Sequence, residues 1–226
     1  MGTAELSAVR ERIVAAARRA DRDPDDVQLL VVSKGRSDAA VQDLYDAGHR
    51  AFGENRPAGL AERLSGGLPG DIEWHFVGNV QRRAIKTIAP SIALLHSLDR
   101  MRLAEAWERL DDPPPVLIEV NIAAEPQKHG FAPTQVHQAV DHLVAGGVAV
   151  HGLMIIPPRV DEAEQARGWF AALREFGEEL RREHPGAIEL SMGMTDDFEV
   201  AVEEGASIVR VGRAIFQPED REDPGD

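Results

Sequence analysis

The amino-acid sequence predicts an α/β protein, a single (β/α)8 TIM barrel with an extra N-terminal helix. One observation is that short apolar stretches alternate with segments of helical period along the chain, which is typical of a parallel sheet. A second is that eight such units follow one another, the number that closes a barrel. A third is that no linker or change of composition divides them, so we expect one domain over residues 1–216.

The expected strands are short, apolar and bounded by polar residues. In the first, Leu29-Leu30-Val31-Val32 runs without interruption into Ser33-Lys34, as in a strand buried on both faces. A doubly wound open sheet is the alternative fold, but it would carry a glycine-rich phosphate turn where Ser33-Lys34-Gly35-Arg36 stands. The eight strands are expected at residues 28–33, 51–55, 72–77, 92–96, 116–122, 148–156, 188–191 and 207–211.

The expected helices show apolar residues at helical spacing and residues typical of helix ends. Gly48 should close one helix, Pro57 opens another, and Asp99 and Thr195 should cap two more. The helices are expected at residues 4–20, 38–47, 57–64, 81–88, 99–110, 133–144, 161–183 and 195–204. Residues 217–226 are acidic and contain proline, which predicts a disordered tail.

Composition excludes several classes of function. The net charge of −14, from 25 basic and 39 acidic residues, argues against nucleic acid or an anionic membrane as the main partner. The absence of cysteine excludes disulfides, thiolate metal sites and cysteine nucleophiles. No apolar run approaches the length of a membrane span and the N-terminus lacks a secretory signal, so we expect a cytoplasmic protein. We also expect a monomer.

Polar residues follow most of the predicted strands, and in a barrel these strand ends meet at one mouth, where ligands bind. Taken alone, Lys34 is best explained as a lysine that buries its stem and exposes its ammonium. The number of polar residues at the same edge favours a binding site instead. They include Lys34, Asn55, His75, His96, Ser97, Asn121, Ser191, Thr195, Arg210 and Arg213.

The segments after the last two strands have the composition of a phosphate site. In barrels such a site uses backbone N–H groups and a helix N-terminus, and glycine lets the backbone approach the phosphate. Ser191, Gly193 and Gly212 fit this, whereas Asp196-Asp197 must point away from a bound phosphate. A lysine nucleophile beside a phosphate site suggests an aldehyde-bearing phosphate held as a Schiff base, with pyridoxal 5′-phosphate (PLP) as the leading candidate.

Arg210 adds information about such a cofactor. Its guanidinium is always charged and only donates hydrogen bonds, so opposite a pyridine nitrogen it would keep that nitrogen unprotonated. This weakens the ring as an electron sink. The alternative is an ordinary buried ion pair with a strand neighbour, and this residue alone does not decide between the two.

Several motifs form one pattern in order along nearly the whole chain. They are Val32-Ser33-Lys34, Phe52-Gly53-Glu54-Asn55, Trp74-His75-Phe76-Val77-Gly78 with Gln81, Glu119-Val120-Asn121-Ile122 with Glu125, Lys128 and Gly130, Gly152-Leu153-Met154, Leu190-Ser191-Met192-Gly193-Met194-Thr195, and Val209-Arg210-Val211-Gly212 with Ala214-Ile215-Phe216. This pattern resembles the pyridoxal phosphate homeostasis protein family. The fold of that family resembles the N-terminal barrel of alanine racemase (fold type III).

The resemblance implies a set of cofactor-binding residues and no metal. They are Lys34, Asn55, His75, Ser191, Met192, Gly193, Arg210, Gly212 and Arg213. Lys34 would carry the Schiff base, Asn55 would lie beside the cofactor, and Arg210 would face the pyridine nitrogen. Ser191 and the backbone near Met192, Gly212 and Arg213 would hold the phosphate.

Three positions depart from the family pattern. Arg213 stands where the family usually has threonine, Arg56-Pro57 replaces Tyr-Val, and Arg83-Ala84 replaces Asn-Lys. Arg213 either adds a charge to the phosphate site or contributes only its N–H group. The departures bear on secondary or exchange sites rather than on the linkage to Lys34.

Three functions are compatible with a Schiff-base lysine. The first hypothesis is a PLP-binding protein that contributes to intracellular PLP homeostasis and passes the cofactor to apo-enzymes, without appreciable catalysis. The alternative is a PLP-dependent amino-acid racemase, which needs acid–base groups on both faces of the substrate. In racemases the second group is a tyrosine from another domain, and here the only tyrosine, Tyr45, is expected away from the mouth. An aldolase-type lyase usually has its lysine on a middle strand, where this chain has none.

Other residues have simpler interpretations. His75, His96 and His151 could suggest a metal barrel, but metal-hydrolase barrels begin with paired histidines on the first strand, where this chain has Ser33-Lys34. Glu125, Lys128 and His129 are expected to be solvated loop residues, and Trp169, Phe170 and Phe176 to be core.

Overall fold

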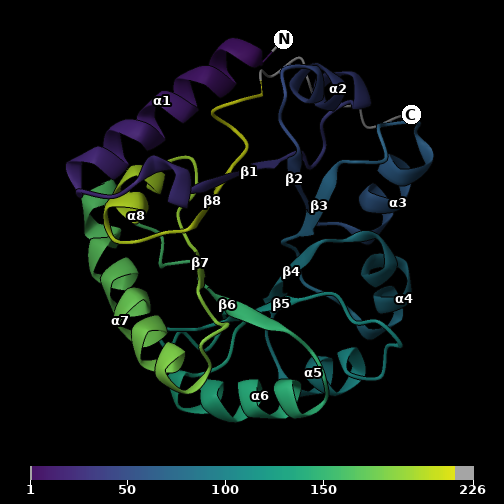
Figure 1. The fold of residues 1–226 in the computed structure, drawn as a ribbon, viewed down its shortest axis with the longest axis vertical. Coiled ribbons are helices and arrows are strands. Elements are labelled where there is room, and N and C mark those ends of the chain that lie inside the picture. Colours follow the sequence, from purple (N-terminus) through teal and green to yellow (C-terminus); the bar gives the residue numbers. More distant parts are fainter. Residues whose placement is uncertain (1, 217–226) are drawn as a thin grey trace.

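The structure is a computed structural model and describes residues 2–216. Within these residues, eight parallel strands close into one barrel in chain order, and helices surround it (Figure 1). The predicted fold class, a (β/α)8 barrel with a leading helix, is therefore confirmed. The tail predicted at residues 217–226 lies outside the described residues.

The strands lie close to their predicted ranges and are all short. They are Gln28–Val32 (β1), Ala51–Glu54 (β2), Glu73–Phe76 (β3), Leu94–Leu98 (β4), Val116–Glu119 (β5), Val150–Met154 (β6), Glu189–Ser191 (β7) and Ile208–Val211 (β8). Because β8 pairs with β1 through Leu30 and Arg210, the first and last strands lie side by side. The residues that follow them therefore share one part of the mouth.

The helices also follow the prediction, with short 3₁₀ segments at several ends. The α-helices are Thr3–Arg19 (α1), Asp38–Asp46 (α2), Pro57–Ser65 (α3), Ile85–Ile88 (α4), Met101–Trp107 (α5), Pro133–Ala145 (α6), Arg167–Glu183 (α7) and Phe198–Glu203 (α8). The 3₁₀ segments are Pro24–Asp26, Arg82–Ala84, Ala89–Ser91 and Ala163–Ala166. None of the helices between residues 2 and 216 combines the length and hydropathy that a membrane span requires.

Two of the predicted helix caps are wrong. Arg100, not Asp99, stands at the cap position of α5, and its side chain makes no capping bond. Thr195 does not cap α8, because the helix begins three residues later. The Asp197 carboxylate instead accepts the Met194 N–H at 2.6 Å, which holds a turn before the helix.

Strand alternation divides the apolar core into two clusters. The larger lies between the barrel and its helices, and it contains fully buried Phe170, with Trp169 and Phe176 packed against it and only partly buried. The smaller fills the barrel interior with Leu30, Ala51, Leu94, Leu117, Met154 and Ile208. Alternation then makes the next inward residues toward the mouth Val32, Glu119 and Arg210. This layer thus includes the charged side chains of Glu119 and Arg210 beside the apolar Val32.

The leading helix α1 packs against α8, two elements far apart in the chain (Figure 1). Leu6, Val9 and Ile13 form its buried face. Exposed ion pairs lie beside this face; Arg19 binds Glu203 at 2.7 Å. Burial of apolar surface is worth more than an exposed ion pair, so the apolar face should hold the helix in place.

Substitutions in α1 should separate these two contributions. Leu6 is 1% exposed, and Leu6→Ala should lower the free energy of unfolding by about 2–5 kcal/mol because it leaves a cavity. Arg19→Ala should cost about 1 kcal/mol or less. Urea unfolding followed by circular dichroism measures both, and similar losses for the two variants would contradict this account.

Candidate functional site

A cavity of about 370 Å³ opens at the carboxyl ends of the strands. Of the residues predicted to bind a cofactor, Lys34, Asn55, Arg210, Gly212 and Arg213 line it. They follow or end β1, β2 and β8, so the barrel topology brings them together although up to 179 positions separate them along the chain (213 − 34). The remaining lining residues are Val32, Arg36, Val77, Ile156, Met194, Thr195, Asp196 and Asp197.

Lys34 lies in a turn just beyond the end of β1, and its side chain is exposed. The turn itself is held by buried polar groups. Ser33 donates its hydroxyl to Glu54 Oε1 at 3.0 Å, and Arg63 donates to the Ser33 carbonyl at 3.2 Å. The exposed Lys34 side chain thus extends from a turn that buried hydrogen bonds hold in place.

Asn55 contributes an unused hydrogen-bonding group to the cavity. Its Oδ1 atom is buried and has no partner among the described residues. Buried amide oxygens almost always find a donor, so an unpartnered one beside a cavity indicates a place for a ligand atom. A half-turn of the amide exchanges its oxygen and nitrogen, so this side chain can present either an acceptor or a donor to that ligand.

Ser191, Met192 and Gly193 do not line this cavity. Ser191 and Met192 are fully buried, and the Met192 N–H donates to the Ile208 carbonyl at 3.1 Å, which makes it unavailable to a phosphate. Gly193 has a φ of +89°, and a Cβ there would lie 2.5 Å from that of Ala201, so no other residue fits this turn. These three residues directly precede the cavity residues Met194 and Thr195 and position them without lining the cavity.

Met194 and Thr195 line the cavity in this segment; Thr195 was expected at the mouth, but neither residue was among the predicted cofactor-binding residues. In the part of the chain that is described, the N–H groups of Thr195, Asp196 and Arg213 donate to no other group. The Arg213 guanidinium is exposed and pairs with Asp196, so Arg213 offers the cavity its N–H group. The sequence does contain a signal for these residues, because glycine at position 193 favours a positive φ, and such a turn directs the residues after it toward the mouth.

Gly212 allows the backbone after β8 to come close to β1. A Cβ at position 212 would lie 2.8 Å from the Val32 carbonyl oxygen, which is closer than real Cβ contacts. The N–H groups after β8 are therefore held next to the turn that carries Lys34.

A chain of hydrogen bonds crosses the barrel interior below the cavity. Arg210 donates to Ser191 Oγ at 2.7 Å, Ser191 Oγ lies 2.8 Å from His96 Nδ1, and His96 Nε2 lies 2.9 Å from His75 Nδ1. Arg210 also donates to the carbonyl oxygens of Ser191 and Ile155, both at 2.8 Å. His75, which was predicted to bind a cofactor, thus belongs to this series of hydrogen bonds and does not line the cavity.

Arg210 sets the direction of this chain of hydrogen bonds. A guanidinium only donates, so Ser191 Oγ accepts, and its own hydrogen must go to His96 Nδ1 or remain buried without an acceptor. His96 then carries its hydrogen on Nε2 and donates to His75 Nδ1. Both histidines are therefore neutral and in the same tautomer.

Burial and charge shift the pKa values of this network in a consistent way. Burial lowers the pKa of His75 to about 4, and burial with the charges of His75 and Arg210 holds that of His96 well below its usual range. Burial also lowers the pKa of Arg210 to about 10, against the attraction of Asp197 and Glu119. Arg210 remains charged at neutral pH, flanked by two carboxyl groups.

Comparison with known proteins assigns this barrel to a family. A curated protein from Aquifex aeolicus (strain VF5), named pyridoxal phosphate homeostasis protein, is 39% identical over 93% of this chain and 95% of its own. The chain belongs to the pyridoxal phosphate homeostasis protein family. This confirms the resemblance that the sequence motifs indicated, and no family model matches the chain.

Solved structures support the same assignment. PipY of Synechococcus elongatus PCC7942, solved with PLP bound, is similar to this member of the homeostasis protein family with a TM-score of 0.82 and 31% identity, over 96% of this chain and all of its own. A lysine/ornithine decarboxylase from Vibrio vulnificus is similar with a TM-score of 0.69 over 92% of this chain and 63% of its own. Its identity is 15%, so the decarboxylase shares the fold alone.

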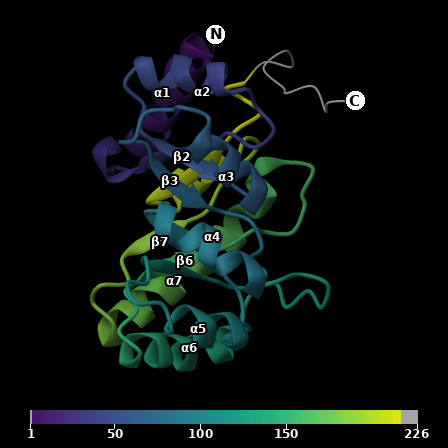
Figure 2. The same ribbon diagram turned by 90° about the vertical axis from the view of Figure 1, so that its right-hand side faces the viewer.

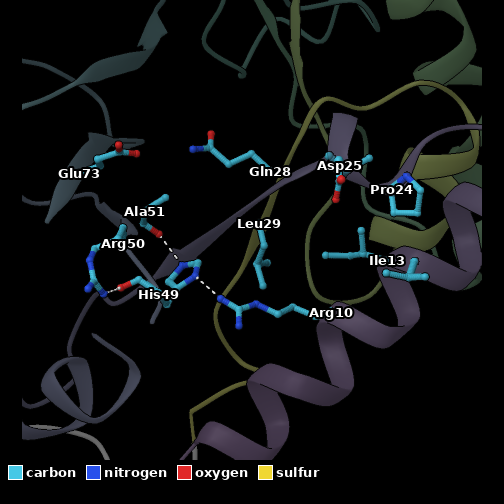
Figure 3. A pocket seen from close by; sticks show the side chains of 12 residues that line it. Arg10, Ile13, Pro24, Asp25, Gln28, Leu29, His49, Arg50, Ala51 and Glu73 are labelled. Atoms are coloured by element: carbon cyan, nitrogen blue, oxygen red, sulfur yellow. Dashed lines mark hydrogen bonds between the residues drawn. The ribbon is translucent and has the colours of Figure 1, made fainter. Parts of the chain in front are cut away.

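A second cavity of about 400 Å³ lies at the opposite end of this homeostasis-family barrel, where β1, β2 and β3 begin (Figure 3). His49 lies there between Arg10 and Ala51, with Arg10 3.1 Å from its Nδ1 and the Ala51 carbonyl 2.8 Å from its Nε2. Both ring nitrogens are occupied, and burial lowers the pKa of His49 to about 4. The histidine thus holds α1 to the barrel.

The histidines of this family member do not form a metal site in residues 2–216, where no group of three His, Asp or Glu side chains is placed to hold an ion. His75 and His96 bind each other, and His151 is exposed. The polar interior is a hydrogen-bonded network of neutral histidines around one arginine.

The neutral histidines should make stability depend on pH. Above about pH 6.5 His75 is neutral in both states, but below it only the unfolded chain gains the proton, so the free energy of unfolding falls until about pH 4. Between pH 7.5 and 5 His75 alone should account for about 2 kcal/mol of this loss.

Urea unfolding at these two pH values, for wild type and His75→Gln, measures this contribution, because other titrating groups cancel in the comparison. His151→Gln replaces an exposed histidine and serves as the control. The same pH dependence in His75→Gln as in wild type would contradict the assignment.

Proposed function

We propose that this chain binds PLP at the barrel mouth, holds it as a Schiff base on Lys34, and contributes to intracellular PLP homeostasis by passing it to apo-enzymes. The observation that carries the proposal is one cavity lined by an exposed lysine, a buried arginine and free backbone N–H groups. The name of the Aquifex relative and the PLP bound in PipY support the same cofactor for this chain.

The residues present fit each part of PLP. Lys34 supplies the amine for the aldehyde, and the unpartnered amide of Asn55 can pair with the ring hydroxyl. The free N–H groups of Thr195, Asp196 and Arg213 suit a phosphate, because backbone donors bind anions well. We therefore place the phosphate at Thr195 and Arg213 rather than at Ser191.

Arg210 determines what bound PLP could do. PLP supplies an electron sink when its pyridine nitrogen is protonated. Arg210 stays charged at neutral pH and only donates, so facing that nitrogen it would keep the nitrogen unprotonated and the sink weak. This favours a protein that holds the cofactor over an enzyme that uses it.

A racemase needs a second acid–base group, and Tyr45 is not placed to provide it. Tyr45 lies on α2, and its hydroxyl donates to Asp71 Oδ1 at 2.5 Å outside the cavity. Among the residues that line the cavity, Lys34 is the one amine or imidazole base. The carrier hypothesis is therefore preferred, and we expect this protein to act in the cytoplasm as a monomer.

The linkage to Lys34 can be tested directly. Purified protein incubated with PLP should absorb in the visible range, and borohydride should fix a pyridoxyl group on Lys34. Lys34→Ala should lose this fixed group, while Lys86→Ala, which removes a lysine of α4, should keep it. Mass spectrometry that places the reduced group only on Lys86 or Lys128 would overturn the assignment.

The carrier and racemase hypotheses differ in proton exchange. The PLP-loaded protein, incubated with L-alanine, L-serine or L-glutamate in deuterated water, should leave the enantiomeric ratio unchanged, because Lys34 is the one amine or imidazole base that lines the cavity and Tyr45 lies outside it. The same preparation should restore activity to an apo PLP-dependent enzyme. Inversion at about 1 s⁻¹ or faster, the low end for ordinary enzymes, would instead support the racemase.

A further inference from the structure

A smaller cavity of about 200 Å³ lies next to the one that contains Lys34. Ile156 lines both, so the two are neighbours. Its walls come mainly from the end of β5 and the segment after it, with Glu119, Asn121, Lys128 and His129 as polar residues. The segments after β5 and β6 project from the same side of the barrel (Figure 2).

Two buried carboxyl groups near this cavity differ in their partners. The Asp99 side chain is 1% exposed and is saturated, by an ion pair with Arg100 and contacts of 3.0 Å with Asn79 and 3.1 Å with His129. Glu119 is 8% exposed and lines the small cavity, and within residues 2–216 its carboxyl oxygens are not among the fully enclosed polar atoms that lack a partner, so they reach the cavity surface. A nearly buried carboxyl group at a cavity surface is a suitable acceptor for a donor of a ligand.

Glu119 points toward the centre of the mouth. It is the next inward residue after Leu117 of the interior cluster, and it pairs in register with Met154 of β6. Its charge acts on Arg210, which lines the Lys34 cavity. The carboxyl group therefore lies between the small cavity and the proposed cofactor site.

The wall of the small cavity is rigid. Phe131 donates to the Glu119 carbonyl at 2.8 Å, and its own carbonyl accepts the Asn121 N–H at 2.9 Å. The Asn121 side chain also donates to the Glu125 carbonyl at 2.8 Å. The segment is thus fixed without any contribution from the Glu119 carboxyl group, which leaves that group available.

The charges around Glu119 place its titration near neutrality. Burial and the Asp99 carboxylate raise the pKa of Glu119 to about 7, while His129, Arg210 and Arg100 oppose this. Lys128, also at the cavity, is paired with Glu125. Near neutral pH, Glu119 can therefore both accept and return a proton.

We propose that Glu119 and the small cavity bind the ammonium group of the primary amine that removes the cofactor from Lys34, and that Glu119 accepts its proton. This inference rests on the proposed function. An ammonium is the donor that a nearly buried carboxylate favours most, and a primary amine is the group that can replace a lysine in a Schiff base.

The exchange is balanced in atoms and charge. The ammonium gives one proton to Glu119, and its nitrogen then bonds to the carbon that Lys34 holds. A second proton passes from that nitrogen to the Lys34 nitrogen of the protonated Schiff base, and the bond from Lys34 to the carbon breaks. The proton held by Glu119 then returns through water to the Lys34 amine, which leaves as an ammonium. No group is oxidised or reduced, and Glu119 ends in its initial state.

Stopped-flow absorbance of the PLP-loaded protein tests this role. Glu119→Gln keeps the shape of the side chain but accepts no proton, so the second-order rate constant for release by L-alanine should fall about a hundredfold. Glu105→Gln, at an exposed position of α5, is the control and should release at the wild-type rate. The wild-type rate constant should rise with a midpoint near pH 7, and Glu119→Gln should lack this step.

Two amines distinguish the source of the ammonium group. L-alanine represents free amino acids, and Nα-acetyl-L-lysine represents a lysine of a recipient protein. A dependence on Glu119 for both supports recognition of the ammonium group itself, and a dependence for one supports that source. Rate constants for both amines within about threefold of wild type in Glu119→Gln would overturn the inference.

A second readout needs no cofactor. In unloaded protein with ¹³C-labelled glutamate carboxyl groups, the signal missing from Glu119→Gln reports the titration of Glu119. L-alanine should shift its midpoint to lower pH because a bound ammonium favours the carboxylate, and N-acetyl-L-alanine should not. A midpoint that L-alanine leaves unchanged would overturn the inference while the Lys34 linkage stands, whereas failure of that linkage is detected separately by the Lys34→Ala experiment.

Discussion

The hydrogen bonds of Arg210 are the constraint on which the mouth of this barrel depends. A buried guanidinium without acceptors would cost several kcal/mol, so the surrounding strands must supply them. Ser191 at the end of β7 and Ile155 just after β6 do so, which ties three neighbouring strands together. The same arginine orients Ser191 and, through it, both interior histidines. Its charge also attracts the nearby carboxyl groups of Asp197 and Glu119.

The fold could be predicted from the sequence because it depends on local patterns. Each strand is a short apolar run, and alternation with helices allows few topologies other than a closed parallel barrel. Lys34, Asn55, Arg210 and Gly212 could be found by the same argument, since all lie at or just beyond strand ends. Helix caps were less predictable, because the Asp99 carboxylate pairs with Arg100, Asn79 and His129, and α8 begins three residues after Thr195.

The rest of the site depends on contacts between distant parts of the chain. The Ser191 hydroxyl was expected to face a phosphate, but His96, 95 positions away, and Arg210 occupy it. Local sequence cannot show this competition, and the position proposed for the phosphate at Thr195 and Arg213 therefore required the structure. Glu119 is a similar case: its motif was visible, but its raised pKa arises from burial and from Asp99 just after β4.

The exposure of Lys34 has a consequence for how long a bound group stays. Under the proposed function, Arg210 and the backbone N–H groups, which are buried or fixed, would contribute most to the equilibrium affinity for the ligand. The lysine turn is open to solvent, so water or an amine would reach a bond to Lys34 without the movement of a covering segment. Substitutions around Lys34 would then change the lifetime of the complex more than its affinity.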